Sequence, residues 1–312
     1  MSEMLTERKK YMLKEIKGFK LYEADEFIEI TDIKDFDLDN ILDCGQCFRW
    51  ERQEDESYIG IAFGKIVRAE YEAETCCLRL YGASAADFEN IWFDYFDLGR
   101  DYGAIKKKLT AEDKIMAAAV EHGSGIRILN QEKWETLLSF IISQNNNIPR
   151  IKKCIESLAC VMGEKVGSYN GRDYYTLPSP EALADADVED LAPCRLGYRA
   201  KYLIETARKV AEEGLESLEA LGDSSVSGEE ALKKLREYCG VGPKVANCIA
   251  LFSMGKFDSF PIDVWVKAVM SRLYGIDEKD VRAMSAYASE NFGEYGGIAQ
   301  QYLFYYITHF DI

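Results

Sequence analysis

One lysine in this 312-residue chain follows a segment that is typical of a phosphate-binding turn. Residues 240–243 read Gly-Val-Gly-Pro, and Lys244 and Val245 come next. Glycine permits backbone shapes that other residues resist, and proline fits the first turn of a new helix. Such a turn leaves N–H groups at the helix start, where Gly240, Gly242 and Val245 could contact a phosphate. The same turn could also merely connect two helices.

The position of Lys244 would suit covalent chemistry. In the first helical turn, the helix dipole and partial burial both act to lower the pKa of a lysine. A neutral amine is the form that attacks carbon and yields a Schiff base. The ordinary alternative is a solvated lysine at a helix start. Cys248 lies four residues later on the same helix face, where its ordinary role is that of a small buried residue.

An aspartate follows Lys244 after nineteen residues, again at an expected helix start. Asp263 comes after the stretch Phe-Pro-Ile at 260–262 and precedes an amphipathic segment. Its ordinary role is that of an N-cap, whose side chain accepts hydrogen bonds from the first turn. A carboxylate held near the preceding helix start could also serve Lys244 and a bound sugar.

Two patterns of apolar residues, one typical of strands and one typical of helices, surround these residues and predict an α+β fold. Residues 20–83 alternate in short β-branched and aromatic runs, which predicts an antiparallel sheet with strands near 27–30, 47–50, 58–61 and 77–80. Residues 1–17 have apolar side chains at roughly helical spacing and are expected to form a short amphipathic helix or a tail. From residue 84 onward the periodicity is helical. Helices are expected over 86–96, 105–108, 114–121, 133–143, 150–162, 202–213, 228–238, 244–254, 264–274 and 299–309.

We therefore predict two domains. Residues 1–115 form an N-terminal antiparallel β-sheet domain with flanking helices, and residues 116–312 form an all-helical domain. The helical domain contains a helix-hairpin-helix motif at about 230–254, followed by the loop that carries Asp263.

The charge of the chain restricts its partners. The chain has 38 Lys and Arg against 54 Asp and Glu, a net charge of −16, which argues against coating of nucleic acid or a membrane by bulk charge. Three segments, 144–154, 191–202 and 238–257, nevertheless contain cations and no acid. With no apolar signal core or membrane span, the nine cysteines are expected to be reduced thiols in a cytoplasmic protein, nucleoid-associated if the source is prokaryotic.

These motifs resemble a known family. The turn at 240–244 and the stretch Pro-Ile-Asp-Val at 261–264 resemble the helix-hairpin-helix and Gly/Pro-Asp signature of base-excision DNA glycosylases, and in particular the 8-oxoguanine DNA glycosylases. The resemblance runs from about residue 45 to residue 304. Four further pieces carry it: 45–50, 143–150, 196–200 and 296–300.

The resemblance implies a bifunctional DNA glycosylase/AP lyase that removes 8-oxoguanine opposite cytosine. Lys244 would attack the deoxyribose C1′ and displace the damaged base, and the resulting Schiff base would permit β-elimination. Asp263 would stabilise the cationic sugar, because charge develops on the ring as the glycosidic bond breaks. The damaged base must first leave the duplex and enter a pocket.

The resemblance also implies the residues of that pocket. The carbonyl of Gly45 would accept the N7–H that oxidised guanine has and guanine lacks. Gln300 would read the Watson–Crick edge, while Phe304 and Cys248 would sandwich the base. Phe252 occupies a further pocket position, one that is often Met in relatives. Without the resemblance, Gly45 could be a strand-end glycine in a bulge and Phe304 a core residue.

Four more residues would hold the rest of the DNA. Asn145, Arg150 and Arg199 match residues that bind the orphaned cytosine, whose acceptor edge suits Asn and Arg donors. Tyr198 matches a wedge that fills the gap in the duplex. Their ordinary alternatives are a polar helix cap and an exposed aromatic loop. Trp265 stands where many relatives have a phosphate-contacting His, which alters that contact.

Cofactors and partners follow from the same reading. An iron–sulfur cluster of the related glycosylases needs four closely spaced C-terminal cysteines, but the last cysteine is Cys248, with 64 residues beyond it. We expect no cluster and no other metal cofactor, with a monovalent cation at the hairpin left open. The expected partner is double-stranded DNA containing oxidised guanine, bound by a monomer, with no membrane. The alternatives are a glycosylase of the same superfamily for another damaged base, and a non-catalytic helix-hairpin-helix DNA-binding protein.

Overall fold

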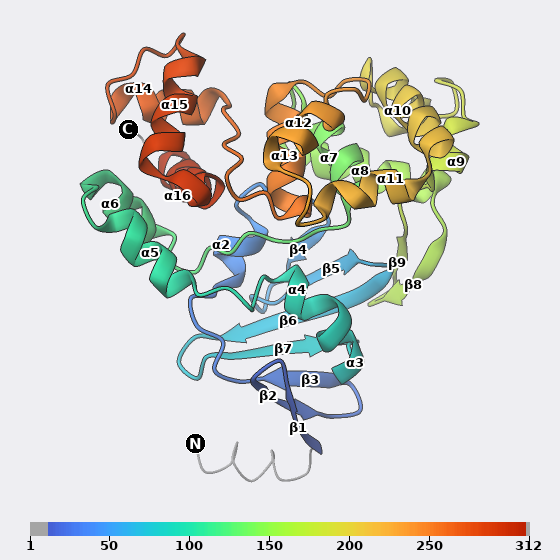
Figure 1. Cartoon of the computed structure of the whole chain (residues 1–312). Coiled ribbons are helices and arrows are strands. Elements are labelled where there is room, and N and C mark those ends of the chain that lie inside the picture. The colour runs from blue at the N-terminus through green and yellow to red at the C-terminus, as the bar shows by residue number, and fades with distance from the viewer. Residues whose placement is uncertain (1–11, 310–312) are drawn as a thin grey trace.

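A seven-stranded antiparallel sheet forms the N-terminal part of the fold in the computed structural model, which describes residues 12–309 (Figure 1). The strands lie in the order β1-β2-β3-β7-β6-β5-β4. Their bounds are β1 Met12–Ile16, β2 Phe19–Glu23, β3 Phe27–Ile30, β4 Trp50–Arg52, β5 Tyr58–Ala62, β6 Lys65–Glu72 and β7 Cys77–Tyr81. At its centre, Ile28 pairs with Leu80 and Ile30 pairs with Leu78, and all four side chains are fully buried. Apolar side chains of these paired strands thus form part of the core under the sheet.

Short helices cover one side of this sheet. They are α2 Leu38–Leu42, α3 Ala85–Asp87, the π-helical turn Phe88–Trp92 and α4 Phe93–Tyr95. Large aromatic side chains fill the space between them and the sheet, and Trp50 Nε1 donates to the hydroxyl of Tyr95 at 2.7 Å. This packing fixes the start of β4, the strand that follows the Gly45 segment.

The prediction for the first 17 residues was wrong where the structure describes them. Residues 12–16 form strand β1, which pairs with β2 from Ile16↔Phe19 to Met12↔Glu23. The turn between them is made by Lys17 and Gly18, both with positive φ, the conformation that suits a two-residue β-hairpin turn. Residues 1–11 lie outside the described residues. The expected strand at 47–50 is also displaced, because β4 begins only at Trp50.

Helices form the rest of the chain. Their bounds are α5 Tyr102–Thr110, α6 Lys114–His122, α7 Lys133–Ser143, α8 Ile148–Met162, α9 Pro180–Ala184, α10 Arg199–Glu213, α11 Leu215–Glu219, α12 Gly228–Leu235, α13 Pro243–Met254, α14 Val264–Arg272, α15 Val281–Asn291 and α16 Gly296–His309, with 3₁₀ turns at Ala192–Cys194, Ala220–Gly222 and Gly293–Tyr295. The predicted α+β class, a sheet followed by a helical part, is confirmed. The boundary at residue 115 stays a prediction.

Two groups of helices stand above the sheet in Figure 1. One contains α5, α6, α14, α15 and α16, and the other contains α7 to α13. One hydrophobic core runs through both groups. A β-hairpin, β8 Lys165–Tyr169 and β9 Arg172–Tyr175, extends from the second group toward the sheet and was not predicted. Among residues 12–309, none of the helices has the length and apolar character that a membrane span requires.

Candidate active site

Lys244 is presented by the turn between α12 and α13. Gly240 has φ +80°, and a Cβ at this position would lie 2.7 Å from the ring of Tyr202, so both the backbone shape and the close packing require glycine. Val241 is buried and anchors the turn. Gly242 is the N-cap of α13, and the first N–H groups of a helix have no partner within the helix. The turn therefore offers an exposed donor surface next to Lys244.

Asp263 caps the next helix start beside it. Its Oδ1 accepts from the backbone N–H of Trp265 at 2.9 Å and of Val266 at 2.8 Å, so the ordinary N-cap role is present. Both of these bonds use Oδ1, and among the described residues none goes to Oδ2. Asp263 and Lys244 line the same cavity of about 50 Å³. The structure thus brings together the two residues that the sequence singled out.

The protonation of Lys244 differs from the prediction. Burial acts to lower its pKa, but attraction to the sulfur of Cys248 and to the carboxylate of Asp263 outweighs burial, and the net pKa is raised. Burial raises the pKa of Cys248, against the opposing effect of the lysine charge. The expectation of a lowered lysine pKa is therefore wrong for the unliganded site. The free chain holds an ammonium beside a neutral thiol at neutral pH.

All five predicted base-pocket residues line this cavity. Its lining consists of Cys44, Gly45, Phe140, Lys244, Cys248, Phe252, Pro261, Asp263, Gln300, Gln301 and Phe304. Gln300 and Phe304 come from α16, and Gln300 Oε1 is buried with no hydrogen-bond partner among the described residues. A buried carbonyl oxygen without a partner is costly, so Gln300 is poised to accept a hydrogen bond from a ligand.

Gly45 faces this pocket from the loop between α2 and β4. Its φ is +80°, and a Cβ here would lie 3.5 Å from the ring of Phe304. The position is therefore a constrained loop beside the pocket wall, rather than a bulge within a strand.

Sequence reasoning missed several residues of the pocket. Phe140 of α7 stacks on Phe252, with ring centroids 5.5 Å apart and an angle of 19° between the planes. Lys244 Nζ lies 5.4 Å from the centre of the Phe140 ring, so this aromatic face also attracts the ammonium. Nothing in the sequence separates Phe140 from the core residues around it on α7. Nothing in the sequence separates Gln301 from the other residues of α16 either, because adjacent residues of a helix do not share a face.

A larger groove of about 820 Å³ opens beside the pocket. It is lined by residues 143–149, by the hairpin residues Gly242 to Val245, and by Asp263 to Trp265. Trp265 is 48% exposed in spite of its size. The groove therefore combines hairpin amides with an apolar lip, a surface that suits a nucleic-acid backbone and sugar.

The residues predicted to hold the opposite base and to fill the gap in the duplex differ in their exposure. Arg150 is exposed in the first turn of α8, and Tyr198 is 51% exposed. Arg199 is only 4% exposed. Its guanidinium donates to the carbonyls of Gln144, of Asn145 at 2.9 Å and of Leu196 at 3.2 Å. In this structure Arg199 therefore supports the loop that carries Asn145, which has φ +47°.

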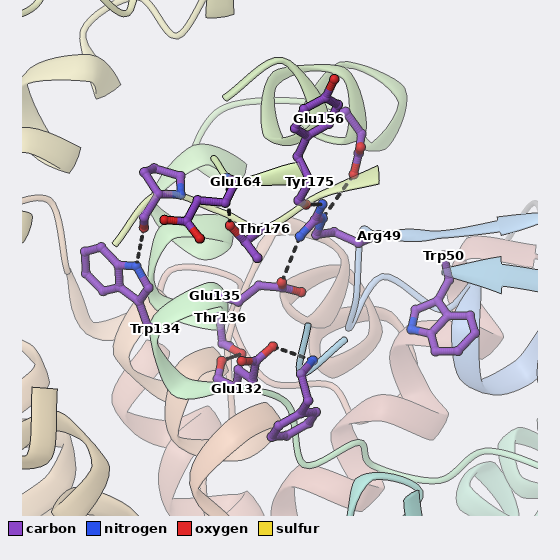
Figure 2. A network of polar contacts seen from close by, with 12 residues as sticks. Arg49, Trp50, Glu132, Trp134, Glu135, Thr136, Glu156, Glu164, Tyr175 and Thr176 are labelled. Carbon is purple, nitrogen blue, oxygen red and sulfur yellow. Dashed lines mark hydrogen bonds and ion pairs between the residues drawn. The ribbon is translucent and has the colours of Figure 1, made fainter. Parts of the chain in front are cut away.

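A buried ion cluster supports the loop that carries Gly45. Figure 2 shows Arg49 between Glu135 of α7 and Glu156 of α8, with N···O distances of 3.3 Å and 3.0 Å. Arg49 also donates to the carbonyl of Tyr175 in β9 at 2.6 Å. Burial raises the pKa of Glu135 to about 7, although Arg49 opposes the shift. The cluster ties the segment after Gly45 to two helices and to the β8–β9 hairpin.

The cysteines form no disulfide in the described chain. Cys44, Cys47, Cys77, Cys154, Cys194 and Cys248 are buried, while Cys160 is exposed. No group of three or more His, Cys, Asp or Glu side chains among residues 12–309 is arranged to hold a metal ion.

Comparisons with known proteins place this site in a family. Residues 29–137 match the model of the N-terminal domain of 8-oxoguanine DNA glycosylase, and residues 138–294 match that of the HhH-GPD superfamily of base excision DNA repair proteins. N-glycosylase/DNA lyase OGG1 of Arabidopsis thaliana is 30% identical over 83% of this chain and 74% of its own length. N-glycosylase/DNA lyase of Saccharomyces cerevisiae is 39% identical over 49% of the chain, a match that spans 43% of the yeast protein.

A solved structure shows the same fold. It is the 8-oxoguanine glycosylase/lyase of Clostridium acetobutylicum in complex with double-stranded DNA containing cytosine opposite 8-oxoguanine. It superposes with a TM-score of 0.87 at 41% identity, covering 94% of this chain and 98% of that one. The chain belongs to the HhH-GPD superfamily of base excision DNA repair proteins, in the branch that carries the N-terminal domain of 8-oxoguanine DNA glycosylases.

Proposed function

We propose that this chain is a bifunctional DNA glycosylase/AP lyase that removes 8-oxoguanine opposite cytosine from duplex DNA. One observation carries the proposal: Lys244 and Asp263 line one cavity with Gly45 and with Gln300, whose oxygen has no partner among the described residues. A nucleophile, a carboxylate and groups that could recognise a base thus line one pocket beside the groove. The membership of the family supports the same substrate.

The first step breaks the bond between the sugar and the base. Lys244 attacks C1′ of the flipped nucleotide, a C1′–Nζ bond forms, and the C1′–N9 bond breaks with its electron pair on the base. The raised pKa of Lys244 means that a proton must leave the ammonium before attack. The departing base takes up that proton. The Asp263 carboxylate stabilises the positive charge that grows on the sugar.

The second step cleaves the strand. Opening of the sugar ring converts the C1′–Nζ adduct into a protonated Schiff base. Loss of a proton from C2′ then expels the 3′ phosphate by β-elimination. Water finally hydrolyses the Schiff base and regenerates Lys244. None of these steps calls for a redox cofactor, and we propose that the chain works without an iron–sulfur cluster, as a monomer, in the cytoplasm.

The net charge of −16 shapes how the chain binds DNA. Hairpin amides and a few placed cations would make the phosphate contacts. Because bulk charge does not help, we expect weak non-specific affinity that falls further with added salt.

Borohydride trapping tests the lyase proposal. The full chain is mixed with a duplex that holds one 8-oxoguanine opposite cytosine, and borohydride reduces any Schiff base to a stable adduct. We expect a covalent adduct with the unmodified chain and none with Lys244→Gln, which keeps much of the side-chain volume but has no amine. No adduct with the unmodified chain, or an undiminished one with Lys244→Gln, would refute the proposal and favour a non-catalytic DNA-binding protein.

A further inference from the structure

Two buried glutamine side chains hold the segment around Gly45 from both sides. Gln301 Nε2 donates to the carbonyl of Cys44 at 2.7 Å, and Gln131 Nε2 donates to the carbonyl of Gln46 at 2.7 Å. The two glutamines are 2% and 8% exposed. The Cys44 carbonyl belongs to the peptide before Gly45, and the Gln46 carbonyl to the peptide after residue 46. The two bonds therefore fix the peptide planes on either side of the one that carries the Gly45 carbonyl.

The side chain of Gln46 removes the remaining freedom. Its Nε2 donates to the carbonyls of Ile41 and Arg127, each at 2.8 Å, and its Oε1 accepts from the N–H of Leu129 at 2.9 Å. The residue is fully buried. A shift of the Gln46 backbone would break several buried hydrogen bonds together, each costly to leave unmade.

Gly45 itself needs this external support. Its φ of +80° lies in a region that glycine enters and leaves at little cost. No hydrogen bond among the described residues reaches the Gly45 carbonyl, so no partner of its own fixes its direction. Guanine and 8-oxoguanine differ at N7 by one proton, and a carbonyl can exploit that difference only within hydrogen-bonding distance and angle. The direction of this carbonyl must therefore be set by its neighbours.

The same glutamines connect Gly45 to the walls of the pocket. Gln301 follows Gln300 on α16 and lies one helical turn before Phe304. The N–H of Gln131 donates to the carbonyl of Phe252 at 2.9 Å. Helix α16 thus carries Gln300, which is predicted to recognise the Watson–Crick edge, the aromatic ring of Phe304, and Gln301, which holds the Gly45 segment. Because they share one helix, these three side chains keep a fixed relative geometry.

We propose that Gln301 and Gln131 are positioning residues for base discrimination, which hold the Gly45 carbonyl at the place where it accepts N7–H from oxidised guanine. The inference rests on the proposed function, because it assigns the Gly45 carbonyl to that proton. Neither glutamine touches the reacting atoms. Their effect is therefore confined to the step that depends on the base.

Two activities of the full chain separate this role from a structural one. Single-turnover excision of 8-oxoguanine opposite cytosine needs the base contact, whereas cleavage at a preformed abasic site opposite cytosine needs Lys244 but no base. For Gln301→Leu and for Gln131→Leu we expect excision to fall about tenfold, because each variant loses its 2.7 Å hydrogen bond to the segment around Gly45. Gln131→Leu also loses a longer bond of 3.4 Å to the carbonyl of Phe252. Abasic-site cleavage by Gln131→Leu, whose side chain does not line the pocket, is expected to stay at the rate of the unmodified chain.

Tyr71→Phe is the matched control. It also removes one side-chain bond to a backbone carbonyl, that from the Tyr71 hydroxyl to Ile33 at 2.8 Å, but within the sheet. It is expected to change neither activity.

A fourth variant supplies a readout that simple loss of stability would not move. Gln301→Glu keeps the shape but turns a carboxylate toward the Cys44 carbonyl. Burial beside an acceptor raises the pKa of such a carboxyl, and its protonated form is again a donor. Excision by Gln301→Glu, relative to the unmodified chain at the same pH, is expected to recover as pH falls from about 8 to about 5.5.

Different failures have different meanings. Excision by Gln301→Leu at the unmodified rate, an equal loss of both activities in Gln131→Leu, or no recovery of Gln301→Glu would overturn the positioning role. Abasic-site cleavage by the unmodified chain without any excision of 8-oxoguanine would instead overturn the proposed substrate. The two proposals are therefore tested separately.

Discussion

The side of the site that receives the damaged base and the side that faces the opposite base are built differently. On the lesion side, Gly45, Cys248 and Gln300 line one cavity among packed helices. On the opposite side, Arg150 and Tyr198 stand exposed on loops. Groups that packing holds in place can distinguish two bases that differ by one proton. Exposed side chains can only contact the opposite base once the duplex has bound. Under the proposed function, the groups that select the lesion would already be in place before DNA binds.

The largest expected effect tests the chemistry of the lesion side. Asp263→Asn removes the carboxylate charge but keeps a good N-cap, because Asn and Asp cap helices about equally well. We expect single-turnover excision to fall about 10²- to 10³-fold, the loss typical of one electrostatic contact to the transition state. The thermal midpoint, measured by circular dichroism, should stay near that of the unmodified chain. A large drop in the midpoint with a matching loss of rate would show that Asp263 acts mainly as a cap.

The next effect contrasts two arginines that the sequence assigned to one task. Arg199→Met removes a buried guanidinium from the carbonyls of Gln144, Asn145 and Leu196, which should lower the free energy of unfolding by about 2–4 kcal/mol. Arg150→Met, at an exposed position, should leave stability within about 0.5 kcal/mol. It should instead reduce the preference for cytosine over the other three opposite bases by roughly tenfold.

Urea unfolding and a four-base excision assay check both variants. The identical replacement serves as the matched control, since only the environment of the two arginines differs. Equal stabilities of the two variants would contradict the supporting role of Arg199. Unchanged base preference in Arg150→Met would remove this arginine from the opposite-base side.

The smallest effect concerns the ion cluster that supports the lesion side. The pKa of Glu135 is about 7 against an ordinary 4.5, so the folded chain holds this proton more tightly than the unfolded chain. This contribution to stability is full below about pH 4.5 and is lost as pH rises through about 7. Glu135→Gln has no such proton, so its stability relative to the unmodified chain should rise by about 1–3 kcal/mol between about pH 5 and about pH 8.

Glu51→Gln is the control for this titration. Glu51 also pairs with an arginine, Arg172, but both side chains are well exposed. An exposed pair of this kind should contribute little to stability. Urea unfolding at several pH values checks both, and a flat difference for Glu135→Gln would show that Glu135 is ionised throughout.

The sequence predicted the parts of the site that depend on short-range sequence signals. The Gly-Val-Gly-Pro turn before Lys244 and the helix start at Asp263 have short-range signals, and the structure brings both residues to one cavity. Periodicity also located most helices, because each buries one face. The strand β1 was missed because its apolar spacing in a short segment fits a helix nearly as well as a strand.

What the sequence could not predict depends on three-dimensional surroundings. The position of Lys244 in the sequence suggests only that burial lowers its pKa. In the structure, attraction to Cys248 and Asp263 outweighs burial and raises that pKa. The burial of Arg199 depends on which carbonyls the loop at Gln144 turns toward it. Gln301 and Gln131 act through backbone carbonyls, and such contacts leave no pattern of residue types to read.

The buried thiol in the pocket has a further consequence for the conditions in which this chain works. Oxidants react with the thiolate rather than with the thiol, and Cys248 is buried with a raised pKa. The agents that damage guanine therefore find little of the reactive form beside Lys244. Cys160, which is exposed, is open to the same agents at a distance from the pocket lining. The chain is thus expected to keep its activity during oxidative stress, because exposed cysteines such as Cys160 would be oxidised before the buried Cys248.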